Sequence, residues 1–97
     1  MSASLSTHVL DTATGSPADG VIVELLQDEL PVARAETDAD GRARLADALP
    51  LGRYRLVFHP PSEFFRRVEY ELELASDRHY HVPLLVSPFS CASYRGS

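Results

Sequence analysis

The sequence contains one cysteine, Cys91, and no tryptophan among its 97 residues. A single cysteine excludes an internal disulfide framework and fits a reducing compartment. A long apolar run is also absent, so we expect no transmembrane span. Residues 1–10 lack the charged and apolar segments of a signal peptide. Together these absences predict a soluble, cytoplasmic protein with no membrane partner.

An excess of positive charge is absent as well. Nine Lys and Arg residues stand against fourteen Asp and Glu residues, which gives a net charge of −5. The arginines are scattered along the chain and form no basic stripe that would attract a phosphate backbone. We therefore expect no nucleic-acid partner.

Helical periodicity is the third absence. Short alternations of apolar and polar residues are instead separated by Gly, Pro and Asp turns, which is typical of strands. The length allows one domain over residues 1–97 with a modest core. We predict an all-β fold, a two-sheet β-sandwich of about eight short strands. The clearest strands are residues 5–10, 20–27, 30–37, 53–59, 68–74 and 79–86, with a last one after Ser87-Pro88.

Three connecting segments are less regular. Residues 38–41 form a turn in which Gly41 can take a positive φ angle. Residues 42–45 are a short strand at best, and residues 49–52 form another turn. Residues 62–65, after Pro60-Pro61, form a compact connection to which we limit any helix, as one turn.

The strand at residues 79–86 opens with two histidines. Side chains two apart share one face of a strand, so His79 and His81 lie on the face that continues with Pro83 and Leu85. That face is too apolar for solvent, yet it carries two imidazoles, which suggests burial against another surface. The opposite face supplies the core contacts Tyr80, Val82, Leu84 and Val86.

The individual candidates for chemistry are weak when each is taken alone. His79 and His81 could present two metal ligands, but zinc uses three or four and no carboxylate or thiolate is spaced nearby, so we predict no metal. Partly buried histidines bonded to the backbone are the simpler interpretation. Cys91 lies in a packed strand without a partner that would make it a nucleophile. By itself, Arg42 is typical of a solvated turn residue.

Several motifs in combination indicate a family. They are Leu5-Ser6-Thr7-His8-Val9-Leu10-Asp11 with Thr14-Gly15-Ser16-Pro17, Thr37-Asp38-Ala39-Asp40-Gly41-Arg42, Gly52-Arg53-Tyr54-Arg55-Leu56-Val57-Phe58, His79-Tyr80-His81-Val82-Pro83-Leu84-Leu85-Val86-Ser87-Pro88 and Tyr94-Arg95-Gly96-Ser97. With these motifs the chain resembles the transthyretin-related 5-hydroxyisourate hydrolases over essentially its whole length. The middle motifs are generic among prealbumin-like modules, whereas the histidine strand and the final Tyr-Arg-Gly-Ser are specific to the hydrolases.

The resemblance implies an eight-stranded prealbumin-like (transthyretin-like) β-sandwich that assembles as a homotetramer, a dimer of dimers, with active sites in a channel between dimers. It implies hydrolysis of 5-hydroxyisourate to 2-oxo-4-hydroxy-4-carboxy-5-ureidoimidazoline in urate and purine degradation. The substrate is thus a small purine-derived molecule, and no cofactor is expected.

The resemblance also implies the catalytic residues, which are His8, Arg42, His81 and Ser97. His8 and His81 would activate water and transfer protons, with the choice of base left open. Arg42 would hold an anionic ring and the oxyanion formed on attack. Ser97 would orient a histidine or the water through its hydroxyl or a terminal carboxylate, and Tyr94 and Arg95 would line the channel and bind substrate.

Two departures from the family pattern are visible. The connection at residues 60–67 is shorter than usual, and Cys91-Ala92-Ser93 replaces a run richer in Tyr, Ser and Thr. The alternative function is a non-catalytic transthyretin-like module that binds a small ligand or serves a structural role. It would explain the middle motifs equally well, but it gives no reason for the histidine strand or the final tetrapeptide.

Overall fold

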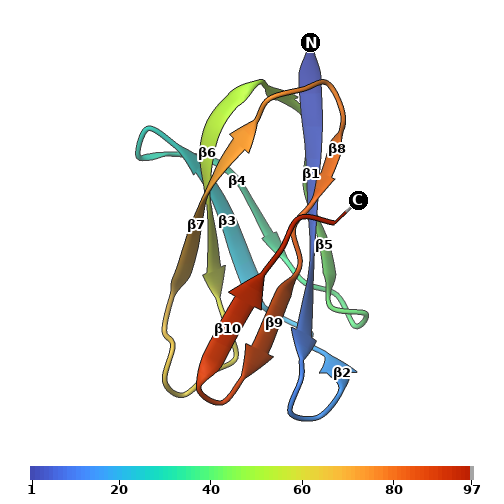
Figure 1. Cartoon of the computed structure of the whole chain (residues 1–97), viewed down its shortest axis with the longest axis vertical. Coiled ribbons are helices and arrows are strands. Elements are labelled where there is room, and N and C mark those ends of the chain that lie inside the picture. The colour runs from blue at the N-terminus through green and yellow to red at the C-terminus, as the bar shows by residue number, and fades with distance from the viewer. Residues whose placement is uncertain (97) are drawn as a thin grey trace.

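The computed structural model describes residues 1–96, which form two β-sheets packed face to face (Figure 1). Ser97 lies outside the described residues. Within the described range there is no helix, and so none long or apolar enough to cross a membrane. The predicted all-β sandwich is confirmed.

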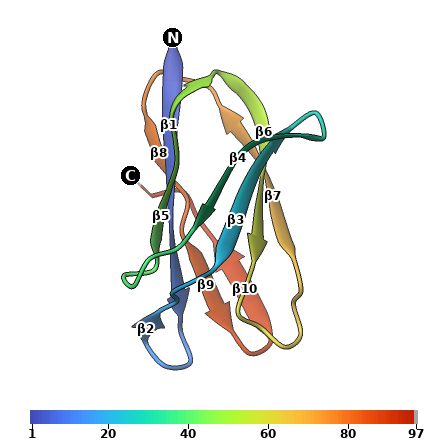
Figure 2. The same cartoon turned by 180° about the vertical axis from the view of Figure 1, so that it is seen from behind.

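The first sheet is built around β1 (Ser2–Asp11), its central strand (Figures 1 and 2). On one side, β1 pairs antiparallel with β5 (Arg42–Pro50) and with the short β2 (Ser16–Pro17). On the other side, it pairs in parallel with β8 (His79–His81) and then β9 (Leu84–Ser87). β10 (Ser90–Ser93) pairs antiparallel with β9. The first and last thirds of the chain therefore meet along one strand.

The second sheet is antiparallel throughout. Its order is β4 (Leu30–Glu36), β3 (Ile22–Gln27), β6 (Gly52–His59) and β7 (Val68–Leu74). Tyr54, Leu56 and Phe58 form the predicted inward row on β6, and all three are buried. The apolar side chains of the two inner faces make one continuous core.

Thr7 is a buried polar residue on the core face of β1. Its hydroxyl donates a hydrogen bond of 2.7 Å to the carbonyl oxygen of Val82, which satisfies the group inside the core. Pro83 follows Val82 and has no amide N–H to donate, so the strand is interrupted there. β8 and β9 are thus two parts of the one strand predicted at residues 79–86. When they are counted as one strand and the two-residue β2 is left out, the ten strands of the structure correspond to the predicted eight.

Two local predictions were wrong. Residues 62–65 form no helical turn, because the Ser62 hydroxyl accepts the amide N–H groups of Phe64 and Phe65 at 3.1 and 3.0 Å and bends the chain instead. The strand that begins at Arg42 is longer than predicted, since β5 continues beyond residue 45 to Pro50. Pairing with β1 along most of its length outweighs the low strand propensity of this Ala- and Asp-containing stretch.

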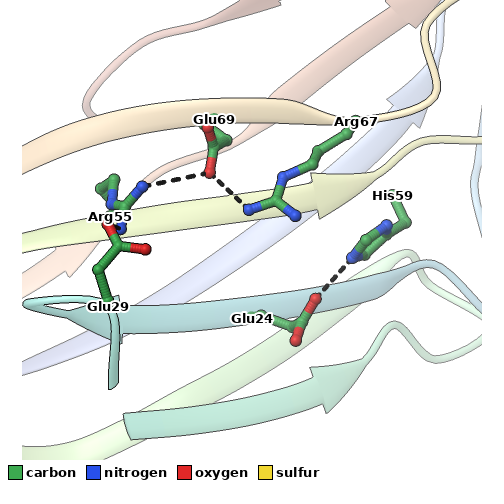
Figure 3. Close-up of polar contacts among 6 residues, drawn as sticks. All are labelled: Glu24, Glu29, Arg55, His59, Arg67 and Glu69. Atoms are coloured by element: carbon green, nitrogen blue, oxygen red, sulfur yellow. Dashed lines mark hydrogen bonds and ion pairs between the residues drawn. The ribbon is translucent and has the colours of Figure 1, made fainter. Parts of the chain in front are cut away.

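The outer face of the second sheet carries a charged network (Figure 3). Glu24 accepts a 2.6 Å hydrogen bond from Nε2 of His59 at the end of β6. Glu69 lies between Arg67, at 2.7 Å, and Arg55, at 3.7 Å. The hydrogen bond from Arg67 lowers the pKa of Glu69. Because all of these side chains are in contact with solvent, the ion pairs are screened by water and contribute little stability.

Gly41 ends the 38–41 turn and is buried against β1 with a φ angle of 74°. A Cβ there would lie 2.5 Å from the carbonyl oxygen of Val9 and 3.0 Å from Cβ of Pro17. We expect Gly41→Ala to lower the free energy of unfolding by roughly 2–4 kcal/mol, the sum of positive-φ strain and a backbone clash.

Gly15→Ala is the matched control for this prediction. Gly15 has nearly the same φ angle, 76°, but a Cβ added there would have no neighbour within 4 Å, so its cost should be about 1 kcal/mol of strain alone. Denaturant unfolding of the two variants measures the difference. Equal losses would show that the close approach of Gly41 to β1 is unimportant.

Candidate active site

Parallel pairing of β1 with β8 brings two polar strand faces side by side. The register aligns Ser4 with His79 and Ser6 with His81. On each strand the neighbouring side chains, among them Leu5 and Tyr80, face the core, so the serines and histidines face outward from the sandwich. Residues more than seventy positions apart in the sequence thus form one polar surface.

The serines and histidines are hydrogen-bonded in a continuous row. Ser4 Oγ lies 2.6 Å from Nδ1 of His79, and Ser6 Oγ lies 2.8 Å from Nε2 of the same ring. Ser6 Oγ also lies 2.8 Å from Nδ1 of His81. The simpler interpretation from the sequence, histidines bonded to the backbone, is therefore wrong, because both rings bond to serine hydroxyls.

The 38–41 turn and the start of β5 position Arg42. Its amide N–H donates to Oδ1 of Asp38 at 3.0 Å, and its carbonyl accepts the Asp38 amide at 2.9 Å. Across the sheet Arg42 is paired in register with His8. Arg44, two residues further along β5, is paired with Asp47, whereas the Arg42 guanidinium has no ion-pair partner among residues 1–96.

An open groove of about 650 Å³ lies over this surface, between β8, β1 and β5. Of the residues predicted for the site, Arg42, His81 and Tyr94 line it. His8 is not a lining residue of the groove in the single chain; it follows the lining residue Thr7 and stands opposite Arg42. The fold therefore places three of the six predicted residues on the lining of one hollow, with His8 paired opposite Arg42 beside it.

The segment after β10 returns to His81. The Gly96 amide donates a 2.7 Å hydrogen bond to the His81 carbonyl, and a Cβ on Gly96 would lie 3.2 Å from Cδ2 of the His81 ring. Only a residue without a side chain passes this close to the imidazole with ease. The predicted site residue Ser97 lies outside the described residues.

Arg95 is not brought into the groove. It lines a second hollow of about 550 Å³, beside β7, with Leu72 and Tyr80 among its neighbours there. Tyr94 borders both hollows and is 57% exposed. Within one chain, Arg95 is thus separated from Arg42 and His81.

The surroundings of His81 favour the neutral imidazole. Burial lowers the pKa of His81, and the positive charge of Arg42, followed by His8 and His79, lowers it further below the usual value of about 6.5. The ring is therefore mostly neutral at pH 7. Its Nδ1 is bonded to Ser6, while Nε2 has no hydrogen-bond partner among residues 1–96. A neutral imidazole with one free nitrogen can take a proton from water.

Metal binding would need a different donor set. Within residues 1–96 no three His, Cys, Asp or Glu side chains are grouped as ligands of one ion. The groove instead combines imidazoles, hydroxyls and a guanidinium, which suits proton transfer next to an anion.

Sequence reasoning missed Ser4, Ser6 and Asp38. Asp38 holds the backbone of Arg42, and the serines hold the two rings. A signal for the serines was present, because Ser4, Ser6 and His8 alternate on one face of the first strand. Their partners could not be inferred without knowing that the first and last strands pair in parallel.

Comparison with known proteins gives consistent matches. A sequence profile of the HIUase/Transthyretin family matches residues 5–96. The 5-hydroxyisourate hydrolase of Caulobacter vibrioides is 40% identical, covering 96% of this chain and 97% of its own length. That of Deinococcus radiodurans is 41% identical, covering 96% and 95%.

Solved structures agree with the sequence matches. The 5-hydroxyisourate hydrolase of Klebsiella pneumoniae superposes with a TM-score of 0.88 at 36% identity and covers 97% of this chain and 99% of its own. Transthyretin from Sparus aurata superposes with a TM-score of 0.84 at 26% identity, covering 95% of both chains. The fold is thus shared by hydrolases and transthyretins.

Proposed function

The chain belongs to the HIUase/Transthyretin family, and from this premise we propose that it hydrolyses 5-hydroxyisourate to 2-oxo-4-hydroxy-4-carboxy-5-ureidoimidazoline in urate degradation. It is a cyclic amide hydrolase, as the two bacterial relatives near 40% identity are named for this activity. We place it in the cytoplasm as one domain over residues 1–97.

The observation that carries this function is the meeting of Arg42 and His81 in one groove. His8, opposite Arg42 on β1, completes a set of two imidazoles and one guanidinium. A non-catalytic module of the transthyretin type shares the sandwich, but it has no need for a neutral imidazole with a free nitrogen beside an unpaired cation. We therefore favour the hydrolase over the module.

The residues supply the chemistry as follows. A histidine, His8 or His81, takes a proton from water as the water oxygen adds to a ring carbonyl carbon of the substrate. The carbonyl oxygen gains negative charge, which the forked guanidinium of Arg42 stabilises by charged hydrogen bonds. The ring C–N bond then breaks, and the histidine returns the proton to the leaving nitrogen.

The remaining members of the proposed site come from the tail. Tyr94 lines the groove, and Ser97 is assigned to the site by its match to the family pattern. Arg95 lines the adjacent hollow, so its contribution to substrate binding requires a contact that one chain alone does not make.

The activity is tested by generating 5-hydroxyisourate with urate oxidase and following its ultraviolet decay. Addition of catalytic amounts of the protein should speed the decay well above the spontaneous rate, in proportion to the amount added. Heat-denatured protein is the control. Decay at the spontaneous rate would exclude the hydrolase and leave the non-catalytic module.

We expect the protein to be a homotetramer, a dimer of dimers. Leu10 and Leu85, next to the site on β1 and β9, remain only half-buried in one chain, and the groove is open. A symmetric partner covering this face would enclose the groove as a channel and limit its exchange with bulk solvent. Light scattering at micromolar concentration should give four times the 10.7 kDa of one chain. A monomer would contradict a channel shared between dimers.

A further inference from the structure

The bridge made by Ser6 between two histidine rings limits where protons can be. A serine hydroxyl has one hydrogen to donate, yet Ser6 Oγ contacts Nε2 of His79 and Nδ1 of His81, both at 2.8 Å. If it donates to one ring, it must accept an N–H from the other. When both rings carry a single proton, their tautomers are therefore coupled through one oxygen atom.

Two orders that run one way along the row satisfy its hydrogen bonds; a third, in which Ser6 accepts an N–H from both rings, also leaves His81 in the Nδ1–H tautomer. In the outward order, Nδ1–H of His81 donates to Ser6, Ser6 donates to Nε2 of His79, and Nδ1–H of His79 donates to Ser4. In the inward order, Ser4 donates to Nδ1 of His79, Nε2–H of His79 donates to Ser6, and Ser6 donates to Nδ1 of His81. The outward order leaves a lone pair on the free Nε2 of His81, and the inward order places a proton there.

Electrostatics select the outward order. The charged and titratable groups around the His81 ring are Arg42 and Arg44 on β5, His8 on β1, His79 on β8, Asp38 in the turn before β5 and Tyr94 after β10. Arg42 can only donate hydrogen bonds, and its positive charge acts on the ring. A lone pair directed toward this positive field is favoured over an N–H dipole. The outer end of the row suits the outward order too, since the exposed Ser4 hydroxyl is free to donate to water.

We propose that Ser6 is a positioning residue that, backed by His79 and Ser4, holds His81 in the Nδ1–H tautomer and so presents the Nε2 lone pair to the groove. The proposal deepens the hydrolase function and rests on it for its catalytic consequence. It identifies His81 as a base at the start of the reaction, because only the unprotonated Nε2 can accept the proton of water. Ser6 lines the groove, and the role proposed for it is exerted through its hydrogen bond to His81.

Nitrogen-15 NMR of the histidine rings tests the tautomer without substrate. Above its pKa, His81 of the wild type should show a protonated Nδ1 and an unprotonated Nε2. In Ser6→Ala the bond to Nδ1 is lost and only the charge of Arg42 still favours the Nδ1–H form, so the population of the Nε2–H tautomer, which free imidazole side chains prefer, should rise. Ser6→Thr keeps a hydroxyl on a strand-compatible side chain and should restore the wild-type pattern.

Kinetics test the consequence for the reaction. In Ser6→Ala, kcat should fall roughly 10- to 100-fold with little change in KM, and Ser6→Thr should recover most of the loss. Ser2→Ala is the matched control, since Ser2 shares the strand face but makes no hydrogen bond to a histidine among residues 1–96, and it should change neither the spectrum nor kcat.

Several outcomes would overturn the proposal. A proton on Nε2 of His81 in the wild type would reverse the order of the row, and this result needs no variant to fold. An unchanged His81 tautomer in Ser6→Ala, or a changed tautomer with an unchanged kcat, would remove Ser6 from its positioning role. A wild type with the expected tautomer but no hydrolysis would instead refute the proposed function.

Discussion

Arg42→Lys should lower kcat/KM for 5-hydroxyisourate by roughly 10²- to 10³-fold while the thermal transition stays in place. The lysine keeps the positive charge at the groove but loses the planar fork that can donate two parallel hydrogen bonds to an anionic ring or oxyanion. Because the Arg42 side chain is exposed and has no ion-pair partner among residues 1–96, the substitution removes no contact that holds the fold.

The effect of the Arg42 charge can be distinguished from the effect of its planar fork by measuring the activity of two variants as a function of pH. With His81 as the proposed base, its neutral form is the active one, so activity should fall as the pH drops through the pKa of His81. The positive charge of Arg42 is one of the causes that lower this pKa. Arg42→Lys keeps that charge and should leave the acid limb of the pH–rate profile in place. Arg42→Gln removes it, so the pKa of His81 should rise and the limb should move to higher pH.

Arg34→Lys is the matched control for both measurements. Arg34 is exposed on β4 of the second sheet, on the other layer of the sandwich, and its change should alter neither kcat/KM nor the pH profile. Equal activity of Arg42→Lys and wild type would make Arg42 a surface residue of the turn. If the acid limbs of the pH–rate profiles of Arg42→Lys and Arg42→Gln coincide, the charge of Arg42 does not affect the pKa of His81.

Much of the fold could be predicted from the sequence because the core uses strict alternation. The inward row of Tyr54, Leu56 and Phe58 and the buried face of the histidine strand were both predicted, since a period of two allows only one buried face. The strand β5 was underestimated because its Ala and Asp residues carry little strand propensity of their own. Its existence depends on pairing with β1, which is a tertiary effect.

The site could be predicted only in part, for a related reason. His8, Arg42 and His81 were identified by motifs, whereas the hydrogen bonds from Ser4 and Ser6 depend on the parallel register of β1 and β8. The position of Arg95 depends on the path of the chain after β10, which turns Tyr94 toward the groove and leaves Arg95 at the adjacent hollow. The sequence of one strand does not show which other strand it pairs with, in which register, or where the chain runs afterwards.

Removal of residues 94–97 should abolish hydrolysis while leaving the thermal transition largely in place. A terminal segment of a small domain is usually dispensable, and Tyr94 and Arg95 are exposed, with Tyr94 at 57%. Its described contacts are nevertheless made at the site, because the Gly96 amide bonds to the His81 carbonyl and Tyr94 lines the groove. Loss of these residues leaves the core intact and uncovers one side of His81.

Four forms of the protein, assayed for 5-hydroxyisourate decay beside melting curves, separate a role in the site from a role in folding. The deletion of residues 94–97 and a C-terminal tag should both be harmful, since a tag extends the chain directly beyond the segment packed on His81. An N-terminal tag should be tolerated because Met1 is 90% exposed. Deletion of Ser97 alone measures the contribution of that residue to activity. Full activity in the four-residue deletion would exclude the tail from catalysis and restrict the site to His8, Arg42 and His81.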